Sequence, residues 1–209
     1  MTSIPIRQML RKYFIMGSQD CISDPVEILE AAAKAGITAF QFREKGQGSL
    51  SGEAKLELGK QLREICFHYD IPFFINDDIK LAEPLQADGI HIGQDDTPAA
   101  AVRRQFPDKL IGLSLSNPDE VDQSPLSLID YAGAGPVFAT GSKADAKTAV
   151  GTEWITSLRK QFPDLPIVGI GGITPANAAS VLEAGAGGVA FISAVSRAIN
   201  IRQAVQSME

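Results

Sequence analysis

Cysteine and histidine are scarce in this sequence, with two of each among 209 residues. Cys21 and Cys66 lie far apart and form no CxxC pair, and His68 and His91 supply no zinc-finger spacing. The composition therefore argues against a disulfide framework and against a structural zinc site. A reducing compartment fits best, and we expect a cytoplasmic protein.

The chain also lacks an excess of basic residues. Its 19 Lys and Arg are outnumbered by 25 Asp and Glu, so the formal net charge is -6. No basic field is available to hold nucleic acid or an anionic membrane, and no run of about 18 apolar residues or export signal is present. We therefore expect small-molecule partners, and an anionic ligand must be bound by a local site.

What the sequence does contain is an alternation of short apolar segments with longer amphipathic ones, which is typical of parallel strands joined by helices. Several of the short segments are apolar throughout, as expected for strands covered on both faces. We predict eight strands, at Lys12–Met16, Ala39–Arg43, Pro72–Asn76, Gly89–Ile92, Leu110–Leu113, Ser127–Ala132, Ile167–Ile170 and Val189–Ile192.

Two of the intervening segments carry helix start and stop signals. In "SDPVEILEAAAKAG", Asp24 is suited to cap the helix, Pro25 to its first turn and Gly36 to its exit. The segment "ITPANAASVLEAGAGG" repeats the pattern with Thr174, Pro175 and Gly185.

Eight strand–helix units without a linker or low-complexity segment favour one compact domain over residues 1–209. We predict an α/β fold, a (β/α)8 TIM barrel, with an open doubly wound sheet as the alternative. In both folds, ligands bind at the carboxyl ends of the strands.

Acidic residues follow two consecutive predicted strands. The third runs into "NDD" (residues 76–78) and the fourth into "QDD" (residues 94–96). Neighbouring carboxylates repel one another unless a cation lies between them, and oxygen-only ligands favour Mg²⁺. We predict a magnesium site formed by these two acidic segments. The alternative is helix capping, which would explain one Asp of each pair, Asp78 and Asp95.

The second predicted strand, "AFQFREK", places Gln41, Arg43 and Lys45 on one face and two phenylalanines on the other. Two cations buried near the barrel rim would be costly without an anionic partner, so this face favours a phosphorylated ligand. An internal ion pair with Glu44 or with the acidic loops is the alternative.

A long polar loop, "GAGPVFATGSKADAKTAVG", follows the sixth predicted strand. It is rich in phosphate donors and long enough to act as a lid, with Thr140, Ser142 and Lys143 as the expected contacts. The same composition is also found in surface loops without a functional role.

The last two predicted strands end in "VGIGGITP" and "GVAFISAVSRA". Gly171 and Gly172 let backbone N–H groups approach an anion, and Ile192 and Ser193 add a second helix start beside them. A glycine pair alone could form only a tight turn. His91 lies within a strand without a triad partner in sequence, so we expect a packed imidazole whose hydrogen bonds are satisfied.

Two anion pockets, one beside a metal, indicate a two-substrate reaction in which a diphosphate leaves and a second phosphorylated molecule replaces it. At this point the chain resembles the thiamine-phosphate synthase family, through "YFIMG", "QFREKG", "NDD", "ADGIHIGQDD", "IGLS", "GPVFATGSK", "PIVGIGGIT" and "FISA" in this order.

The resemblance implies that a hydroxymethylpyrimidine diphosphate is joined to a thiazole phosphate with Mg²⁺, giving thiamine phosphate and pyrophosphate after dissociative loss of the diphosphate. It implies metal binding by Asp77 and Asp96, and catalytic roles for Arg43, Lys45 and Lys143. It implies pyrimidine diphosphate binding by Gln41, Arg43, Lys45, Asn76, Ser114 and Lys143, and thiazole phosphate binding by Thr140, Ser142, Gly172, Ile192 and Ser193.

The chain departs from the family pattern at two positions, because Ser116 stands where a histidine is frequent and "TGSK" replaces the commoner Thr-x-Thr-Lys. Two other functions are compatible with the resemblance: a related thiazole tautomerase, and a non-catalytic sensor of phosphorylated thiamine precursors. The tautomerase should not need the acidic residues and the diphosphate-binding cations, which this sequence retains. A missing Asp77, Asp96 or Lys143 would favour the sensor, and none of the three is missing.

Overall fold

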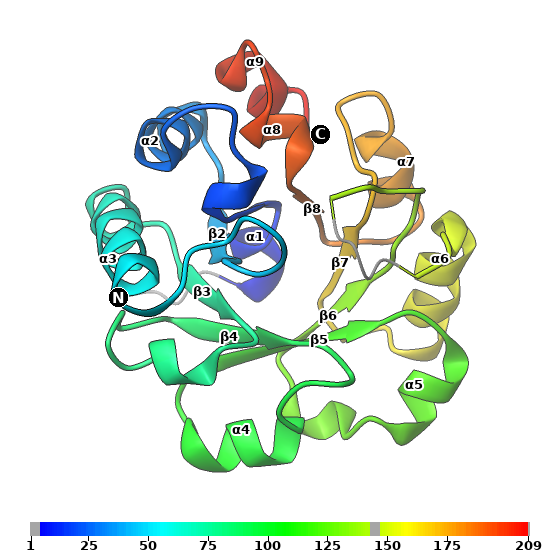
Figure 1. Cartoon of the computed structure of the whole chain (residues 1–209). Helices are drawn as coiled ribbons and strands as arrows, with labels where there is room; N and C mark the ends of the chain where they lie inside the picture. Colours follow the sequence, from blue (N-terminus) through cyan, green and yellow to red (C-terminus); the bar gives the residue numbers. More distant parts are fainter. Residues whose placement is uncertain (1–4, 143–146, 209) are drawn as a thin grey trace.

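In a computed structural model of the chain, residues 5–142 and 147–208 are described, and their strands form a closed parallel barrel (Figure 1). Each strand pairs with the next, and β8 pairs with β1 through Lys12 and Val189. The predicted (β/α)8 TIM barrel is confirmed. The strands are β1 (Lys12–Met16), β2 (Ala39–Phe42), β3 (Phe73–Asn76), β4 (Gly89–Ile92), β5 (Leu110–Leu115), β6 (Tyr131–Ala134), β7 (Ile167–Ile170) and β8 (Gly188–Phe191).

Helices surround the barrel as an outer ring (Figure 1). The exception is the short α1, whose Ile6 and Met9 pack against the interior residues of the barrel. The helices are α1 (Ile6–Met9), α2 (Pro25–Ala35), α3 (Gly52–His68), α4 (Ala99–Gln105), α5 (Pro118–Gln123), α6 (Gly151–Gln161), α7 (Ala178–Glu183), α8 (Ser193–Ser196) and α9 (Ile201–Gln206), with 3₁₀ turns η1 (Ser18–Asp20), η2 (Ile79–Leu81) and η3 (Leu126–Leu128).

Seven of the predicted strands agree with the structure to within two residues at either end. The sixth prediction, Ser127–Ala132, is wrong: the apolar residues of η3 form a 3₁₀ turn, and β6 is the later segment Tyr131–Ala134. This strand alternates alanine and glycine after its tyrosine, so it lacks the β-branched residues by which strands are usually predicted.

The helix signals are confirmed at α2 and partly wrong at α7. At α2, the Asp24 side chain accepts a hydrogen bond from the Val26 N–H, and Gly36 ends the helix with φ 96°. At α7, Thr174 is not the cap, because the helix begins only at Ala178. The Thr174 N–H instead donates to Asn177 Oδ1, and Gly185 follows the helix with φ 107°, as predicted.

Two apolar layers hold the barrel together. One lies between the strands and the outer helices, and it includes Phe14, Phe40 and Phe73. The other fills the barrel interior, where the rings of Tyr13 and Phe74 pack with centroids 5.3 Å apart. Because these side chains fill the barrel interior, the pocket inside the barrel lies at the carboxyl end of the strands.

Gly188 lies where β8 approaches the chain entering β1, and we expect its substitution to destabilise the fold. A Cβ at this position would lie 1.9 Å from the Leu10 carbonyl oxygen, so the Gly188→Ala backbone must shift. We expect a loss of about 3 kcal/mol in unfolding free energy and a Tm lower by roughly 6–12 °C. Thermal unfolding of both proteins measures the difference.

Gly141→Ala is the matched control, because a Cβ at Gly141 has no neighbour within 4 Å among the described residues. It should unfold like the unmodified protein. Equal Tm values for all three proteins would contradict the role assigned to Gly188.

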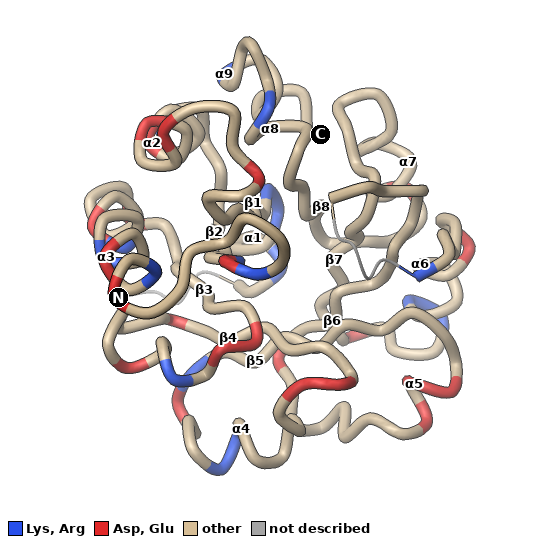
Figure 2. Tube along the Cα trace, in the orientation of Figure 1, with Lys and Arg blue, Asp and Glu red and all other residues tan. Residues whose placement is uncertain are grey.

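Charged residues of both signs are interspersed around the barrel (Figure 2). Both cysteines are free, and burial is the largest cause of the raised thiol pKa, which reaches about 12 for Cys21. Of the helices in the described ranges, none is long and apolar enough to cross a membrane.

Candidate functional site

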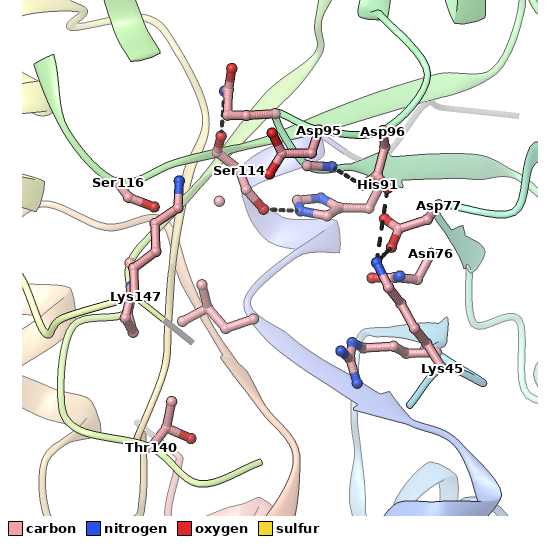
Figure 3. A pocket seen from close by; sticks show the side chains of 17 residues that line it. Lys45, Asn76, Asp77, His91, Asp95, Asp96, Ser114, Ser116, Thr140 and Lys147 are labelled. Carbon is pink, nitrogen blue, oxygen red and sulfur yellow. Dashed lines mark hydrogen bonds and ion pairs between the residues drawn. The ribbon is translucent and has the colours of Figure 1, made fainter. Parts of the chain in front are cut away.

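A pocket opens at the carboxyl ends of the strands, between the loops that follow β2 to β6 (Figure 3). Several predicted site residues line it, as the fold requires for side chains placed at strand ends. Its lining comprises Arg43, Lys45, Asn76, Asp77, His91, Gly93, Gln94, Asp95, Asp96, Ser114, Ser116, Gly133, Gly135, Pro136, Thr140, Lys147 and Ile170.

The two acidic tips predicted to be neighbours lie together in this pocket. Asp77 follows β3 in a left-handed conformation with φ 59°, and its N–H donates to the His91 carbonyl of the next strand. Asp96 is held by the Gly93 N–H, which donates to its Oδ2 at 2.7 Å. Lys45 Nζ lies 2.5 Å from Asp77 Oδ2 and 3.8 Å from Asp96 Oδ1.

Crowding of the two carboxyl groups affects their protonation. Burial raises the pKa of Asp96, and the adjacent Asp77 carboxyl raises it further. A cation between the two groups relieves this repulsion, and Lys45 lies there in the free protein (Figure 3).

The donor chemistry fits Mg²⁺, which binds proteins through one or two carboxylates and takes its other ligands from water and substrate phosphates. Within residues 5–142 and 147–208, no cluster of three or more acidic, histidine or cysteine side chains forms a closed metal cage. Asp77 and Asp96 are the residues here that could hold such an ion.

The capping alternative for Asp78 and Asp95 is wrong. Asp78 precedes η2 without a side-chain cap, and its Oδ2 pairs with Lys55 Nζ at 2.9 Å. Asp95 lies exposed at the pocket, whereas Asp96 closes the turn through Gly93.

The polar face of β2 is only partly buried, in contrast to our prediction. Gln41 and Arg43 are buried, but the Lys45 side chain is 46% exposed because the strand has ended at Phe42. Lys45 instead forms the alternative that we considered, an ion pair with the acidic loops. Glu44 binds the Ser18 N–H and hydroxyl.

His91 is a packed imidazole with satisfied hydrogen bonds, as predicted. Its Nδ1 lies 3.0 Å from Tyr131 Oη, and its Nε2 lies 2.9 Å from Ser114 Oγ. His91 also lines the pocket, beside Asn76 and Ser114. The sequence prediction did not include His91 among the pocket residues. The missed signal is the strand period of two, which points residue 91 into the barrel together with Gly89.

The residues expected to form the second anion pocket converge at the ends of β6, β7 and β8. Ser142 Oγ donates to Ser193 Oγ at 3.1 Å, and the Ser142 N–H donates to Thr140 Oγ1. Gly172 has φ 64° and lies close to the chain at Phe138, where a side chain would clash.

Three more residues singled out in the sequence are Ile192, Lys143 and Ser116. Ile192 is buried and precedes the exposed Ser193 at the start of α8. Lys143 lies outside the described residues. Ser116, the departure from the family pattern, lines the pocket, and its N–H donates to Glu120.

Lys147 is a further cation that the sequence prediction missed. It lines the pocket on the side opposite Lys45 (Figure 3). Its ammonium forms an ion pair with the largely buried Glu120. The available signal was its place in the same polar loop, four residues after Lys143.

Comparison with known proteins gives consistent matches over nearly the whole chain. The sequence profile described as thiamine monophosphate synthase matches residues 12–195. The chain is 62% identical over 202 residues to a thiamine-phosphate synthase of Oceanobacillus iheyensis, covering 97% of this chain and 98% of that protein.

Solved structures agree with this result. A thiamine phosphate pyrophosphorylase from Pyrococcus furiosus superposes with a TM-score of 0.85 at 32% identity, covering 97% of this chain and 95% of that chain. A (S)-3-O-geranylgeranylglyceryl phosphate synthase from Thermoplasma acidophilum has a TM-score of 0.65 at 15% identity, covering 100% of this chain and 97% of that chain, and shares the fold alone.

Proposed function

Because this chain belongs to the thiamine monophosphate synthase family, we propose that its pocket joins a pyrimidine diphosphate to a thiazole phosphate, releasing thiamine phosphate and pyrophosphate. The enzyme is then a transferase. The observation that carries the proposal is the convergence of Asp77 and Asp96 beside Arg43 and Lys45 in one pocket.

The pyrimidine diphosphate is bound where these groups meet. Arg43 and Lys45 neutralise the diphosphate, and Asn76 and Ser114 offer hydrogen bonds from the neighbouring strands. Lys143 adds a further cation from the loop after β6. Gln41 is buried and donates to Tyr13, so it acts from beneath the pocket.

The thiazole phosphate is bound at the ends of the last strands. Thr140, Ser142 and Ser193 supply hydroxyl groups, and the backbone at Gly172 and Ile192 supplies N–H donors, an arrangement common in this barrel.

Mg²⁺ held by Asp77 and Asp96 would neutralise charge on the departing diphosphate. Lys45 is placed to leave the two carboxylates and bind diphosphate oxygens when the ligand arrives, since its side chain is 46% exposed.

The reaction is dissociative. The C–O bond between the pyrimidine methylene and the diphosphate breaks first, with both electrons leaving on the diphosphate. The thiazole nitrogen then donates its lone pair to the resulting carbocation, and the new C–N bond forms. No side-chain base is needed, and the protein contributes position and electrostatic stabilisation.

The test is to incubate the purified protein with both substrates and Mg²⁺ and to measure pyrophosphate and thiamine phosphate together. Equal amounts of both products are expected. A thiazole tautomerase would release no pyrophosphate, and a sensor would bind the precursors without turnover, so either result would refute the proposal. A cytoplasmic location stays a prediction.

A further inference from the structure

We propose that a buried chain of hydrogen bonds, from Gln41 through Tyr13, Tyr131 and His91, is a positioning network that makes Ser114 a hydrogen-bond donor to the ligand. The inference deepens the proposed function and rests on it only for the identity of that ligand. None of the first four residues needs to touch the reacting atoms.

The series of hydrogen bonds crosses the barrel interior without a gap. Gln41 Nε2 donates to Tyr13 Oη at 2.8 Å, and Tyr13 Oη lies 2.9 Å from Tyr131 Oη. Tyr131 Oη lies 3.0 Å from His91 Nδ1, and His91 Nε2 lies 2.9 Å from Ser114 Oγ. The five residues come from β2, β1, β6, β4 and β5, so the network exists only in the closed barrel.

The first of these bonds has a fixed direction. An amide nitrogen can only donate, so Tyr13 Oη accepts from Gln41. Either hydroxyl can donate between Tyr13 and Tyr131, and we take Tyr13 as the donor, because its buried proton then has an acceptor. Tyr131 therefore donates to His91 Nδ1. With Nδ1 accepting, the neutral imidazole carries its proton on Nε2 and donates it to Ser114 Oγ.

The two phenols keep their protons, which this direction requires. Tyr13 and Tyr131 are buried, and burial is the largest cause of the raised pKa of each hydroxyl. Each phenol therefore has one proton to donate at neutral pH.

Glycines on two strands leave the space that the network occupies. A Cβ at Gly112 would lie 2.1 Å from Tyr131 Cζ and 2.5 Å from His91 Nδ1. A Cβ at Gly133 would lie 3.0 Å from His91 Cε1. A side chain at Gly112 would therefore displace Tyr131 and the imidazole, and one at Gly133 would press against the imidazole.

The network determines the hydrogen bonding of Ser114, which is its last member and lines the pocket. Since its oxygen already accepts from His91, its own proton is available to an anionic oxygen in the pocket. With the opposite direction, Ser114 would donate to His91 and present lone pairs to the anion.

The first test measures which nitrogen of His91 carries the proton. The sequence has two histidines, so ¹⁵N-histidine NMR of the free protein gives two ring patterns, and His68→Gln identifies the one from His91. We expect His91 protonated on Nε2 alone, and a partial or complete change to Nδ1 in Tyr131→Phe. A proton on Nδ1 in the unmodified protein would overturn the proposal.

The second test asks whether the network acts through Ser114. We expect Tyr131→Phe to weaken pyrophosphate binding and raise KM for the pyrimidine diphosphate by about tenfold, with a smaller change in kcat. In a Ser114→Ala background the same substitution should cost little, because the two residues form one unit. Equal losses in both backgrounds would refute the coupling.

A matched pair at His91 separates positioning from packing. In His91→Gln the amide nitrogen can take the place of Nε2 and donate to Ser114, whereas the shorter side chain in His91→Asn reaches only the Nδ1 position. We expect pyrophosphate affinity to be retained better in the Gln variant, and the reverse order would count against the proposal. Tyr69→Phe, outside the pocket, is the control and should behave as the unmodified enzyme.

The two proposals can fail separately. The protonation of His91 is measured without substrate, and pyrophosphate binding is measured by calorimetry without turnover. A protein that makes no thiamine phosphate but keeps the Nε2 proton and the binding pattern would refute the synthase reaction alone.

Discussion

Asp77→Asn is expected to lower the synthase rate by about 100-fold or more at limiting Mg²⁺, because it removes one of the two carboxylates that hold the ion. Asparagine keeps the size of the side chain and tolerates the left-handed backbone at this position, so the fold should be retained. The measurement is the initial rate as a function of Mg²⁺ concentration. A calorimetric titration of Mg²⁺ in the presence of pyrophosphate gives a second readout.

The neighbouring residue supplies the control. Asp78 pairs with Lys55 and does not line the pocket, so Asp78→Asn should keep the magnesium dependence of the unmodified enzyme. In Asp77→Asn the ion pair with the exposed Lys45 is lost, and this loss should cost less than about 1 kcal/mol of unfolding free energy. An unchanged rate at limiting Mg²⁺ for Asp77→Asn would contradict the metal assignment.

Lys143→Ala is expected to slow the loss of diphosphate by about two to three orders of magnitude, as for other preorganised groups that stabilise developing charge. The expectation rests on the sequence, in which Lys143 follows Thr140 and Ser142 in the loop after β6. Single-turnover measurements with excess enzyme separate this step from product release.

Two comparisons sharpen the result. Lys143→Arg keeps the positive charge and should recover part of the rate. Lys147→Ala should lose less than Lys143→Ala, because the Lys147 ammonium is already paired with Glu120. Normal turnover of Lys143→Ala would remove this lysine from the mechanism.

The barrel and the acidic site could be predicted from the sequence because both depend on local patterns. Parallel strands in a closed barrel all end at the same rim, so "NDD" and "QDD" after consecutive strands must be neighbours. The position of Lys45 at this rim could be predicted in the same way. Its exposure could not, because the strand period ceases to apply once β2 ends at Phe42.

The interior network could not be predicted in this way. Tyr13 and Tyr131 are 118 residues apart, and their contact depends on the register of all the strands between them. The sixth strand was misplaced for a related reason, since a Cβ at Gly133 would lie 3.0 Å from His91 Cε1, a contact that strand propensity does not show. The contacts of Tyr13, Tyr131 and Gly133 are made with residues from distant strands, and only the three-dimensional structure identifies them.

The pairing of β8 with β1 also determines when this protein can fold during its synthesis. The edge of β1 receives its partner only when Gly188–Phe191 has left the ribosome, after most of the chain has emerged. Until then a nascent chain carries an unpaired strand edge, which is prone to aggregate with other chains. Early chaperone binding should therefore matter most for translation intermediates that end before Gly188.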